Sequence, residues 1–509
     1  MVERAPIAES SEWTFETLEL FERQIARVAE RYRLSTYPNQ IEIITAEQMM
    51  DRYSSVGMPL GYHHWSLGKQ FLSTEQKYRR GHMGLAYELV INSNPCIAYL
   101  MEENTLAMQA LVIAHACFGH NSFFKGNYLF RTWTDASAIV NYLLFARNYI
   151  AECEERHGLD ATESLLDSCH ALMNYGVDRF RRPRPISGEV EKLRQIEREA
   201  FLQQHVNDLW RTVPKKEAPK GAEWPRFPKE PQENLLYFIE KNAPLLEPWE
   251  REIVRIVRKI AQYFYPQRQT KVMNEGWATF WHYTLLNTLY DEGLVTDGFM
   301  FEILQSHTNV TYQPEFDSPY FNGINPYTLG YSIFSDIRRI CESPTDEDRA
   351  FFPELVGKDW IDATHHAMEN FKDESFILQF LSPTIIRNLK LFSIMDDDRE
   401  KEIQVTAIHD DQGYRRIREQ LADQHNLSKQ EPNIQIYEVD LRGNRSMTLR
   451  HIQRDRVPLH KDDATKVMKH LHTLWRFDVL LESTQDGHVT SSYVCDSDSV
   501  RRVADGATS

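Results

Sequence analysis

Residues Val272 to Thr288 read VMNEGWATFWHYTLLNT, and this stretch places an ionisable Glu and His inside an otherwise apolar and aromatic segment. Its helical periodicity continues that of the residues before it. On an α-helix, Glu275 and His282 would lie within about 20° of each other on one face, two turns and roughly 10 Å apart. Burying a carboxylate is costly unless a metal ion or an imidazolium faces it. We therefore expect either a functional site or a buried, hydrogen-bonded Glu and His on this helix.

A second apolar stretch, LVIAHACFGHNSFFKGNYLF, contains His115 and His120. An imidazole in such a run is expected to be a ligand, an acid or base, or a buried hydrogen-bond donor. A spacing of five residues on an ideal α-helix points the two side chains about 140° apart. Joint ligation of one ion therefore requires a π-bulge or a helix that ends near Gly119. The polar residues Asn121 and Lys125 follow directly.

Composition restricts the class of partner. The chain has 509 residues, 42% of them hydrophobic, and a net charge of -16. This acidic balance argues against a nucleic acid or an anionic membrane as the main partner. No run of about 18 apolar residues is present, and the first residues lack the features of a secretory signal. We expect a cytoplasmic protein that neither binds nucleic acid nor inserts into a membrane.

The six cysteines are scattered along the chain, without a Cys-x-x-Cys pair. In a chain of this length the pattern predicts reduced, mostly buried thiols. It favours neither a disulfide framework nor a thiolate zinc site.

The chain divides by its periodicity. Helical spacing dominates up to about residue 381, with a polar, Pro-rich excursion at about 180–231. After that, strand-like stretches such as NIQIYEVDL and SMTLRHIQRD alternate with two helical ones. The sequence therefore predicts a mainly α protein, with a large helical domain over residues 1–385 and a small α+β domain over residues 386–509.

Several long blocks resemble one known family, the SpoVR family, named for stage V sporulation protein R. The similarity runs from about Trp13 to about Leu480 and is strongest with the Gram-negative branch. The blocks are TYPNQIEIITAEQMMDRYSSVGMPLGYHHWSLGKQF, YELVINSNPCIAYLMEENT, AHACFGHNSFFKGN, LLDSCHALMNYGVDR, PQENLLYFIEKNAPLLEPWEREI, QTKVMNEGWATFWHYTLLN and INPYTLGYSIFSDIRRI.

The resemblance implies a cytoplasmic protein made under stress or on entry into stationary phase. It also implies a link to sporulation and to cell-envelope formation, meaning the spore cortex and peptidoglycan, and a protein partner in a neighbouring serine-kinase stress system. It does not bring a settled catalytic activity.

The sequence is also similar, more weakly, to gluzincin metallopeptidases, in which one helix carries His-Glu-x-x-His and a later helix carries Asn-Glu-Gly-x-Ala. NEGWA places Glu275 at the position of the third ligand, and His115 with His120 resembles the first helix. This resemblance implies a zincin-like helical domain that binds a divalent transition metal, zinc above all. An open coordination position for water would suit hydrolysis of a peptide or muropeptide-like substrate.

The first motif departs from the gluzincin pattern in two ways. AHACFGH has five steps between the histidines instead of four, and Ala116 occupies the place of the general-base glutamate. Replacement bases could come from Glu102, Glu103 or His282. Nothing in the sequence selects among these three.

Further polar residues are candidates for contact with a substrate. His64 and Lys69 lie in YHHWSLGKQF, which is either a pocket loop or an amphipathic turn, and Asn325 and Tyr327 open the predicted helix in FNGINPYTLGYSIFSDIRRI. Asn121 and Lys125 complete the set.

Two functions from different classes remain open. The first is a metal-dependent hydrolase whose site is built by His115, His120 and Glu275. The second is a non-catalytic regulator or scaffold that binds a protein partner in a stress-response pathway, with the same residues forming a buried hydrogen-bond network. The missing general base favours the second.

Overall fold

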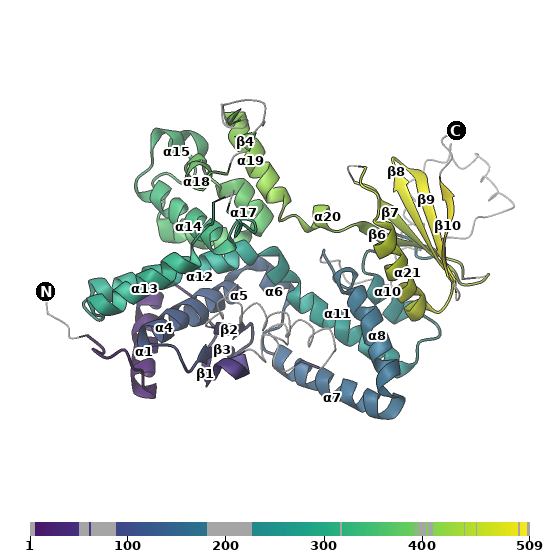
Figure 1. Ribbon diagram of the computed structural model, residues 1–509, viewed down its shortest axis with the longest axis horizontal. Coiled ribbons are helices and arrows are strands. Elements are labelled where there is room, and N and C mark those ends of the chain that lie inside the picture. Colours follow the sequence, from purple (N-terminus) through teal and green to yellow (C-terminus); the bar gives the residue numbers. More distant parts are fainter. Residues whose placement is uncertain are drawn as a thin grey trace, which may run out of the picture. The chain divides into compact units, whose positions relative to one another are not determined.

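The computed structural model describes residues 6–49, 61–62, 88–180, 226–315, 318–391, 394–395, 404–405, 411–441, 443–454, 456–496 and 499–505 (Figure 1). Its contacts divide the chain into two compact units. The first contains Met1–His170 and Glu247–Pro432, and the second contains Ala171–Leu246 and Asn433–Ser509. Each unit is described by itself below.

The first unit is mainly helical, as the periodicity predicts. Its helices are α1 (Phe15–Arg31), α4 (Leu106–Val112), η1 (Ile113–His120), α5 (Asn121–Gly126), α6 (Tyr128–Trp133), α7 (Ile139–His157), α8 (Leu159–Ala171), α11 (Pro248–Gln269), α12 (Lys271–Asp291), α13 (Asp297–Val310), α14 (Pro326–Glu342), α15 (Asp346–Phe351), α16 (Trp360–Asn370), α17 (Asp373–Phe380), α18 (Pro383–Asn388), α19 (Asp411–Asp423) and α20 (Leu427–Gln430). Two short strands, β4 (Ile394–Met395) and β5 (Gln404–Val405), pair with each other.

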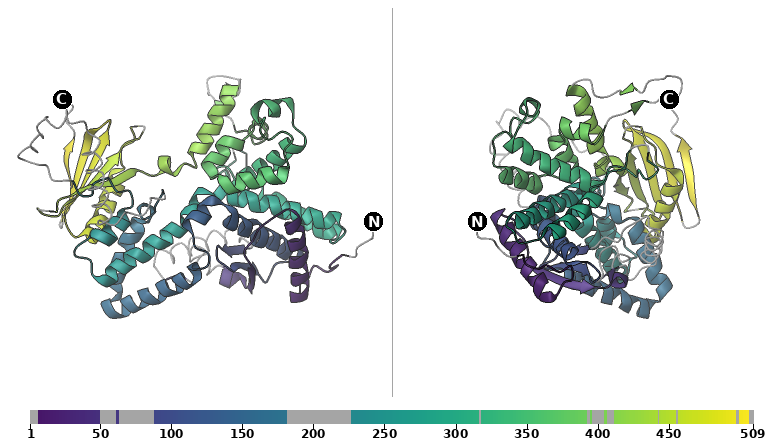
Figure 2. Two further views of the ribbon diagram at one scale, coloured as in Figure 1. Left: turned by 180° about the vertical axis from the view of Figure 1, so that it is seen from behind. Right: turned by 60° about the vertical axis from the view of Figure 1, so that its left-hand side comes forward.

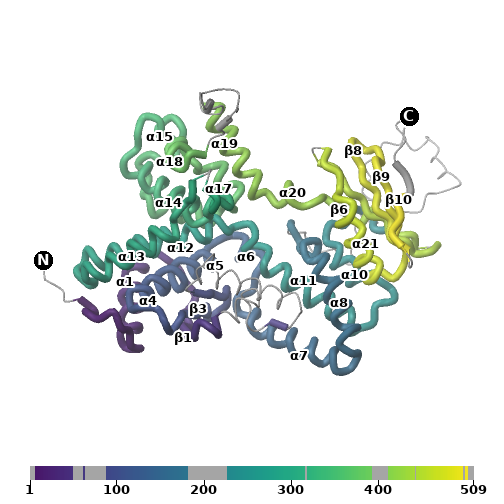
Figure 3. Tube along the Cα trace, in the orientation of Figure 1, coloured from purple at the N-terminus to yellow at the C-terminus, as the bar shows by residue number. Residues whose placement is uncertain are grey.

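A small sheet supports one side of this unit. Its strands β1 (Asn39–Ile44), β3 (Cys96–Met101) and β2 (Glu88–Ile91) lie in that order, with β1 parallel and β2 antiparallel to β3. The paired strands β1 and β3 lie next to each other in Figure 3. Every residue of β3 is buried, as expected for the central strand of a covered sheet. Both β2 and β3 contact η1, so the sheet brings Glu88 to the helix that carries the two histidines.

Helix α12 contains the stretch quoted first and lies at the centre of the unit, against η1 and α14 (Figure 1). Trp277 and Trp281 are completely buried on it. Two glycine positions allow the helices to approach closely. A Cβ atom on Gly276 would lie 2.3 Å from the backbone of Gly330 in α14, and one on Gly119 in η1 would lie 2.5 Å from Ala278 Cα. The small residues in NEGWA and CFGH therefore fix how tightly three helices pack.

The first turn of α12 is capped by a residue distant in sequence. The residue directly before the helix, Thr270, makes no capping hydrogen bond with its side chain. Instead, the buried Asp373 accepts hydrogen bonds from the Val272 N–H at 2.9 Å and the Met273 N–H at 2.8 Å. A carboxylate satisfies the free N–H groups of a helix start and complements its dipole. Asp373 thus holds in place the turn that precedes Glu275.

Replacing Asp373 with Ala should lower the unfolding free energy at pH 5 by about 2–4 kcal/mol, because two buried N–H groups lose their acceptors. Burial raises the pKa of Asp373 to about 7, whereas the unfolded chain releases this proton near pH 4. Proton binding therefore favours the folded wild-type protein at low pH, and this contribution is lost as the pH rises through about 7. The difference between the two proteins should shrink by about 2–3 kcal/mol between pH 5 and pH 8.

Urea unfolding at the two pH values measures this difference. Asp362→Ala is a suitable control, because Asp362 is an exposed residue of α16 that pairs with Arg33 on the surface, and such pairs contribute less than about 1 kcal/mol. A difference for Asp373→Ala that widens with rising pH would contradict the assignment.

The second unit is an α+β assembly. Its sheet has the strand order β10 (Val500–Asp505), β9 (His488–Cys495), β8 (Val479–Gln485), β7 (Met447–Ile452) and β6 (Asn433–Val439). The β7–β8 pair is parallel and is connected through α21 (Lys461–Trp475), which packs on the sheet (Figure 2). The short helix η2 (Met173–Tyr175) and α10 (Leu235–Asn242) also belong to this unit.

The boundary of the helical unit, as its contacts define it, lies beyond residue 385, where periodicity predicts it. Helix α19 packs on α17, and its buried Ile417, Leu421 and Ala422 join the hydrophobic core of the helical unit. The helical unit therefore extends to Pro432. An amphipathic helix can cover either neighbouring domain, so its own sequence does not show which core receives its apolar face.

Two expectations from composition can be compared with the structure. All six cysteines are free and buried, which confirms that they form no disulfide framework. Across the residues whose placement is described, no helix combines the length and the apolar character needed to cross a lipid bilayer.

Candidate metal centre

The two histidines are brought together by a π-helix. Residues Ile113–His120 form η1, and the next residue, Asn121, donates its N–H to Ala116 O, five residues earlier. In this i→i+5 pattern, side chains five residues apart point in similar directions. The rings of His115 and His120 have centroids 4.7 Å apart. Of the two geometries that the sequence left open, the structure has the π-helix.

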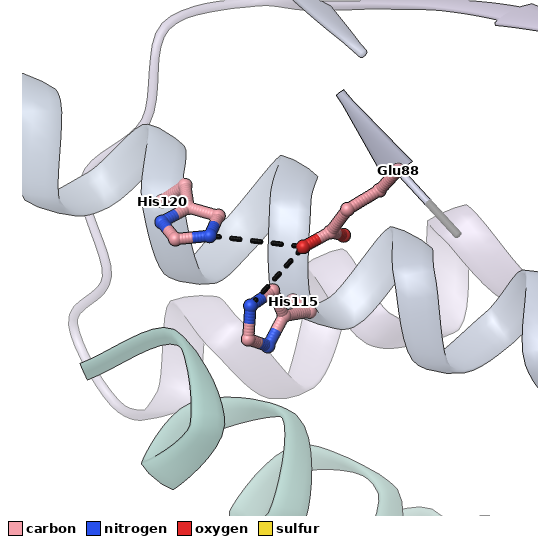
Figure 4. A group of neighbouring side chains, drawn as sticks. All are labelled: Glu88, His115 and His120. Atoms are coloured by element: carbon pink, nitrogen blue, oxygen red, sulfur yellow. Dashed lines mark ion pairs between the residues drawn. The ribbon is translucent and has the colours of Figure 1, made fainter. Parts of the chain in front are cut away.

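A carboxylate from the small sheet faces both rings. Figure 4 shows Glu88, at the start of β2, reaching toward the two histidines. Glu88 Oε1 lies 3.1 Å from His115 Nε2 and 3.7 Å from His120 Nε2. The ligand atoms of these three residues all lie within 4.8 Å of one another. Sequence reasoning missed Glu88. Its only signal is a single charged residue directly before the apolar run LVI, and nothing in that run indicates which helix it faces.

Glu275 of α12 approaches the same two nitrogen atoms. Its Oε2 atom lies 3.4 Å from His120 Nε2 and 3.9 Å from His115 Nε2. Within the described part of the chain, this buried oxygen has no hydrogen-bond partner. Tyr327 also hydrogen-bonds Glu275, and its ring stacks on that of His115 with centroids 6.2 Å apart. The structure thus brings together His115, His120, Glu275 and Tyr327, and adds Glu88.

The Nδ1 atom of each histidine ring, which is the outer nitrogen relative to the two carboxyl groups, is held by another side chain. His120 Nδ1 lies 2.9 Å from Asn274 Oδ1, so this nitrogen carries the proton and donates it to the amide oxygen. His115 Nδ1 lies 2.8 Å from His282 Nδ1, and His282 Nε2 lies 2.9 Å from His307 Nδ1 in α13. With Nδ1 occupied in this way, both Nε2 atoms face the two carboxylates. Fixing the outer nitrogen is the usual way in which proteins orient a histidine ligand.

Burial and charge push the two carboxyl groups in opposite directions. Burial raises the pKa of Glu88 well above its usual value, and the neighbouring Glu275 adds to the shift. Burial also opposes ionisation of Glu275, but His120 and His115 outweigh it, so the pKa of Glu275 is lowered. Burial lowers the pKa of His115 to about 4. Near pH 7 the imidazole of His115 is therefore neutral, and Glu275 is more readily ionised than Glu88.

This donor set fits a small divalent ion. Tetrahedral zinc binds nitrogen and oxygen ligands at about 2.0–2.2 Å, so its ligand atoms are roughly 3.4 Å from one another. The four separations between imidazole nitrogen and carboxylate oxygen, 3.1, 3.4, 3.7 and 3.9 Å, bracket this value. Neutral imidazole and carboxylate are also the protonation states that bind metal.

The other candidate bases take different positions. His282 lies behind His115, completely buried, and contacts the site through that ring. Glu102 and Glu103 lie in an exposed turn after β3, where Glu103 accepts a hydrogen bond from the Ala46 N–H. Among the described residues, Glu88 and Glu275 pair with His115 and His120, and neither Glu102 nor Glu103 does so.

The candidate substrate-binding residues separate into groups. Asn121 bonds the backbone of Tyr37, and Lys125 donates to Thr36 O at 2.6 Å. Asn325 caps α14 by accepting from the Tyr327 N–H. These contacts support the fold around the site, whereas Tyr327 itself contacts the site. His64 and Lys69 lie outside the described residues.

Comparison with known proteins agrees with the sequence blocks. The family described as SpoVR like protein matches residues 12–430, and the family described as SpoVR-like C-terminal domain matches residues 432–486. The uncharacterized protein YcgB of Escherichia coli (strain K12) is 63% identical over 485 residues, which cover 95% of each chain. No solved structure matches the chain. With nearly its whole length matched, the chain belongs to the SpoVR family.

Proposed function

We propose that this protein is a metal-dependent hydrolase with a zincin-like site, acting on a peptide or muropeptide-like substrate. The observation that carries the proposal is the convergence of two imidazole Nε2 atoms and two carboxylates at one buried point. The orientation of both rings by Asn274 and His282 supports it further. His115, His120 and Glu275 are the proposed ligands of a divalent transition metal such as zinc.

Glu88 is the proposed replacement for the missing general base. Ala116 cannot accept a proton, but Glu88 enters from the neighbouring strand and reaches the same two nitrogen atoms. A metal ion in the site would polarise a substrate carbonyl and activate water for attack. In this arrangement Glu88 takes a proton from the attacking water and delivers it to the leaving group, while Tyr327 and Asn274 hold Glu275 and His120 in orientation.

Elemental analysis of the protein purified without chelator tests the metal. We expect about one zinc or similar ion per chain, and removal of the ion should abolish hydrolysis of a peptide or peptidoglycan fragment. Glu88→Gln should keep the ion but lower kcat by about 10²- to 10⁴-fold. Glu275→Gln should lose the ion. If Glu88→Gln loses the ion and Glu275→Gln retains it, the two roles are reversed. Protein without a stoichiometric ion refutes the proposal.

His282 is a positioning residue in this scheme, because it fixes the ring of His115 from behind. His282→Ala should weaken metal affinity by about 10- to 100-fold, the usual effect of losing the partner of a histidine ligand. Competition with a chromophoric chelator measures the affinity. His282→Asn, which can still accept the His115 Nδ1 proton, should recover part of it, whereas a purely structural role would give equal affinities in the two variants.

The second candidate function is a regulator or scaffold in a stress-response pathway. In that case Glu88 and Glu275 would form a buried hydrogen-bond network with the histidines, as their opposite pKa shifts permit. This second proposal includes what the resemblance to the family implies, namely a cytoplasmic role linked to sporulation, stationary phase or envelope formation, with a partner in a serine-kinase system. Glu275→Ala would then lower stability without loss of an ion or an activity.

A further inference from the structure

Three buried histidines from three helices form a continuous chain that leads away from the candidate metal centre. His115 Nδ1 lies 2.8 Å from His282 Nδ1, and His282 Nε2 lies 2.9 Å from His307 Nδ1. All three side chains are buried. Both separations are those of a hydrogen bond, so each of the two gaps holds one proton. His307 is not among the residues that the sequence indicates as candidates.

All three imidazoles of this chain are neutral near pH 7. Burial lowers the pKa of His115 and that of His307 to about 4. Burial also lowers the pKa of His282 well below its usual value, and the neighbouring His115 adds to the shift. A neutral imidazole carries one proton, on one of its two ring nitrogens. The three rings therefore share three protons. Two of these fill the gaps, and the third is at one end of the chain, on His115 Nε2 or on His307 Nε2.

The proposed role of His115 as a ligand decides between the two ends. An imidazole nitrogen that binds a metal ion carries no proton, so Nε2 of His115 must be bare and its Nδ1 must donate to His282. The Nε2 atom of His282 then carries a proton and donates it to His307 Nδ1. This order needs an acceptor at position 307, because the N–H of His282 would otherwise be buried without a partner. In the reverse order, His115 Nε2 is protonated and cannot bind an ion.

The ring of His307 is fixed by aromatic side chains. Its centroid lies 4.7 Å from that of Tyr283 and 4.8 Å from that of Tyr331. The ring stands nearly perpendicular to that of His282, with an interplanar angle of 87°. His307 thus combines two properties that substitution can separate: a ring packed between two tyrosines, and an Nδ1 atom that accepts the His282 proton.

We propose that His307 is a positioning residue of the metal centre: it is the last acceptor in a chain of imidazole hydrogen bonds that keeps Nε2 of His115 free to bind the ion. The inference rests on the proposed metal chemistry and extends it to α13, a helix that supplies none of the proposed ligands. His307 acts through His282, whose hydrogen-bond direction it fixes.

The metal affinities of His307→Asn and His307→Phe test this role in the full-length protein, by competition for zinc with a chromophoric chelator. Asparagine places Oδ1 where histidine has Nδ1, so it accepts the His282 proton but lacks the ring. Phenylalanine keeps the ring between the two tyrosines but accepts nothing. We expect His307→Phe to weaken affinity by about tenfold, the lower end of the effect of residues that orient a ligand. His307→Asn should bind nearly as tightly as the wild type.

A role in packing alone predicts the opposite order, with His307→Asn weaker than His307→Phe, and that order would overturn the proposal. His366→Phe makes the same chemical change at an exposed histidine of α16. It is the matched control and should bind zinc as the wild type does.

A double-mutant cycle shows whether His307 acts through His282. In a His282→Ala background, His307→Phe should cause no further loss of metal affinity, because the residue on which it acts is already gone. Losses that multiply in the double variant would mean that the two residues act independently, which contradicts the proposed chain.

Magnetic resonance of the zinc-loaded wild type, with histidine rings labelled with the magnetic isotope of nitrogen, gives a readout that needs no variant to fold. We expect a coupling between His282 Nε2 and His307 Nδ1, which reports the N–H···N bond directly, and its absence overturns the proposal. Wild-type protein without an ion refutes the proposed function and this role together. An ion held with unchanged affinity in His307→Phe refutes the role of His307 alone.

Discussion

His120→Ala is expected to remove the bound metal ion, with a loss of affinity greater than the 10- to 100-fold typical of residues that only orient a ligand. The side chain supplies an Nε2 atom that lies 3.4 Å from Glu275 and 3.7 Å from Glu88, and an alanine in its place supplies no donor atom. His115→Ala should have the same effect. Elemental analysis and titration with cobalt, whose visible spectrum reports tetrahedral coordination, measure the loss.

His366→Ala provides the matched control for these variants. His366 lies on α16, is exposed, and contacts Asn370 and Phe371. We expect it to retain one ion per chain and the wild-type unfolding temperature. If His120→Ala keeps its ion at full stoichiometry, or if His366→Ala loses the ion equally, the metal does not occupy the site between η1, β2 and α12.

Gly276→Ala is expected to lower the unfolding free energy by about 3 kcal/mol or more and to disturb the metal centre as well. Its new Cβ atom would lie 2.3 Å from the Cα and C atoms of Gly330. Backbone atoms cannot rotate away, so α12 would have to move from α14. Glu275 directly precedes Gly276 and would move with the helix. Urea unfolding measures the first effect, and metal affinity measures the second.

Gly298→Ala is the control for this prediction, because it makes the same chemical change at a helix position that no other residue approaches. Gly298 lies in the first turn of α13, and a Cβ atom there would meet nothing within 4 Å. Removing the flexibility of glycine from the unfolded chain should stabilise this variant by about 0.4–1 kcal/mol. Equal stabilities of Gly276→Ala and the wild type would show that α12 and α14 are not packed this closely.

The site differs from the gluzincin pattern in the elements that supply its two carboxylates. There, the general base and the first two ligands share one helix, but here Ala116 occupies the position of that base. The π-helix turns both histidines to one face, and the third side chain near them comes from a strand. A site built from three elements, η1, β2 and α12, depends on tertiary packing more than one built on two helices. This dependence is the reason for the expected sensitivity to Gly276→Ala.

Much of the architecture follows from the sequence. The apolar periodicity of residues 272–288 predicts the helix observed as α12, and the buried Trp277 and Trp281 confirm its apolar character. The alternating stretches NIQIYEVDL and SMTLRHIQRD correspond to β6 and β7. These features depend on local periodicity, which a single segment contains in full. The strands β8 to β10 were not among the predicted stretches, although VLLESTQ and HVTSSYVC form β8 and β9.

The sequence by itself determined the SpoVR family, the helical character of the larger unit, and His115, His120 and Glu275 as residues of interest. Tertiary structure alone decided that η1 is a π-helix, that Glu88 faces both histidines, and that His282 and Asn274 hold the outer nitrogens. Each of these depends on contacts between residues more than 20 positions apart or on a hydrogen-bond pattern that packing selects. Side-chain periodicity shows which face of an element is apolar, but it does not show which distant residue that face meets.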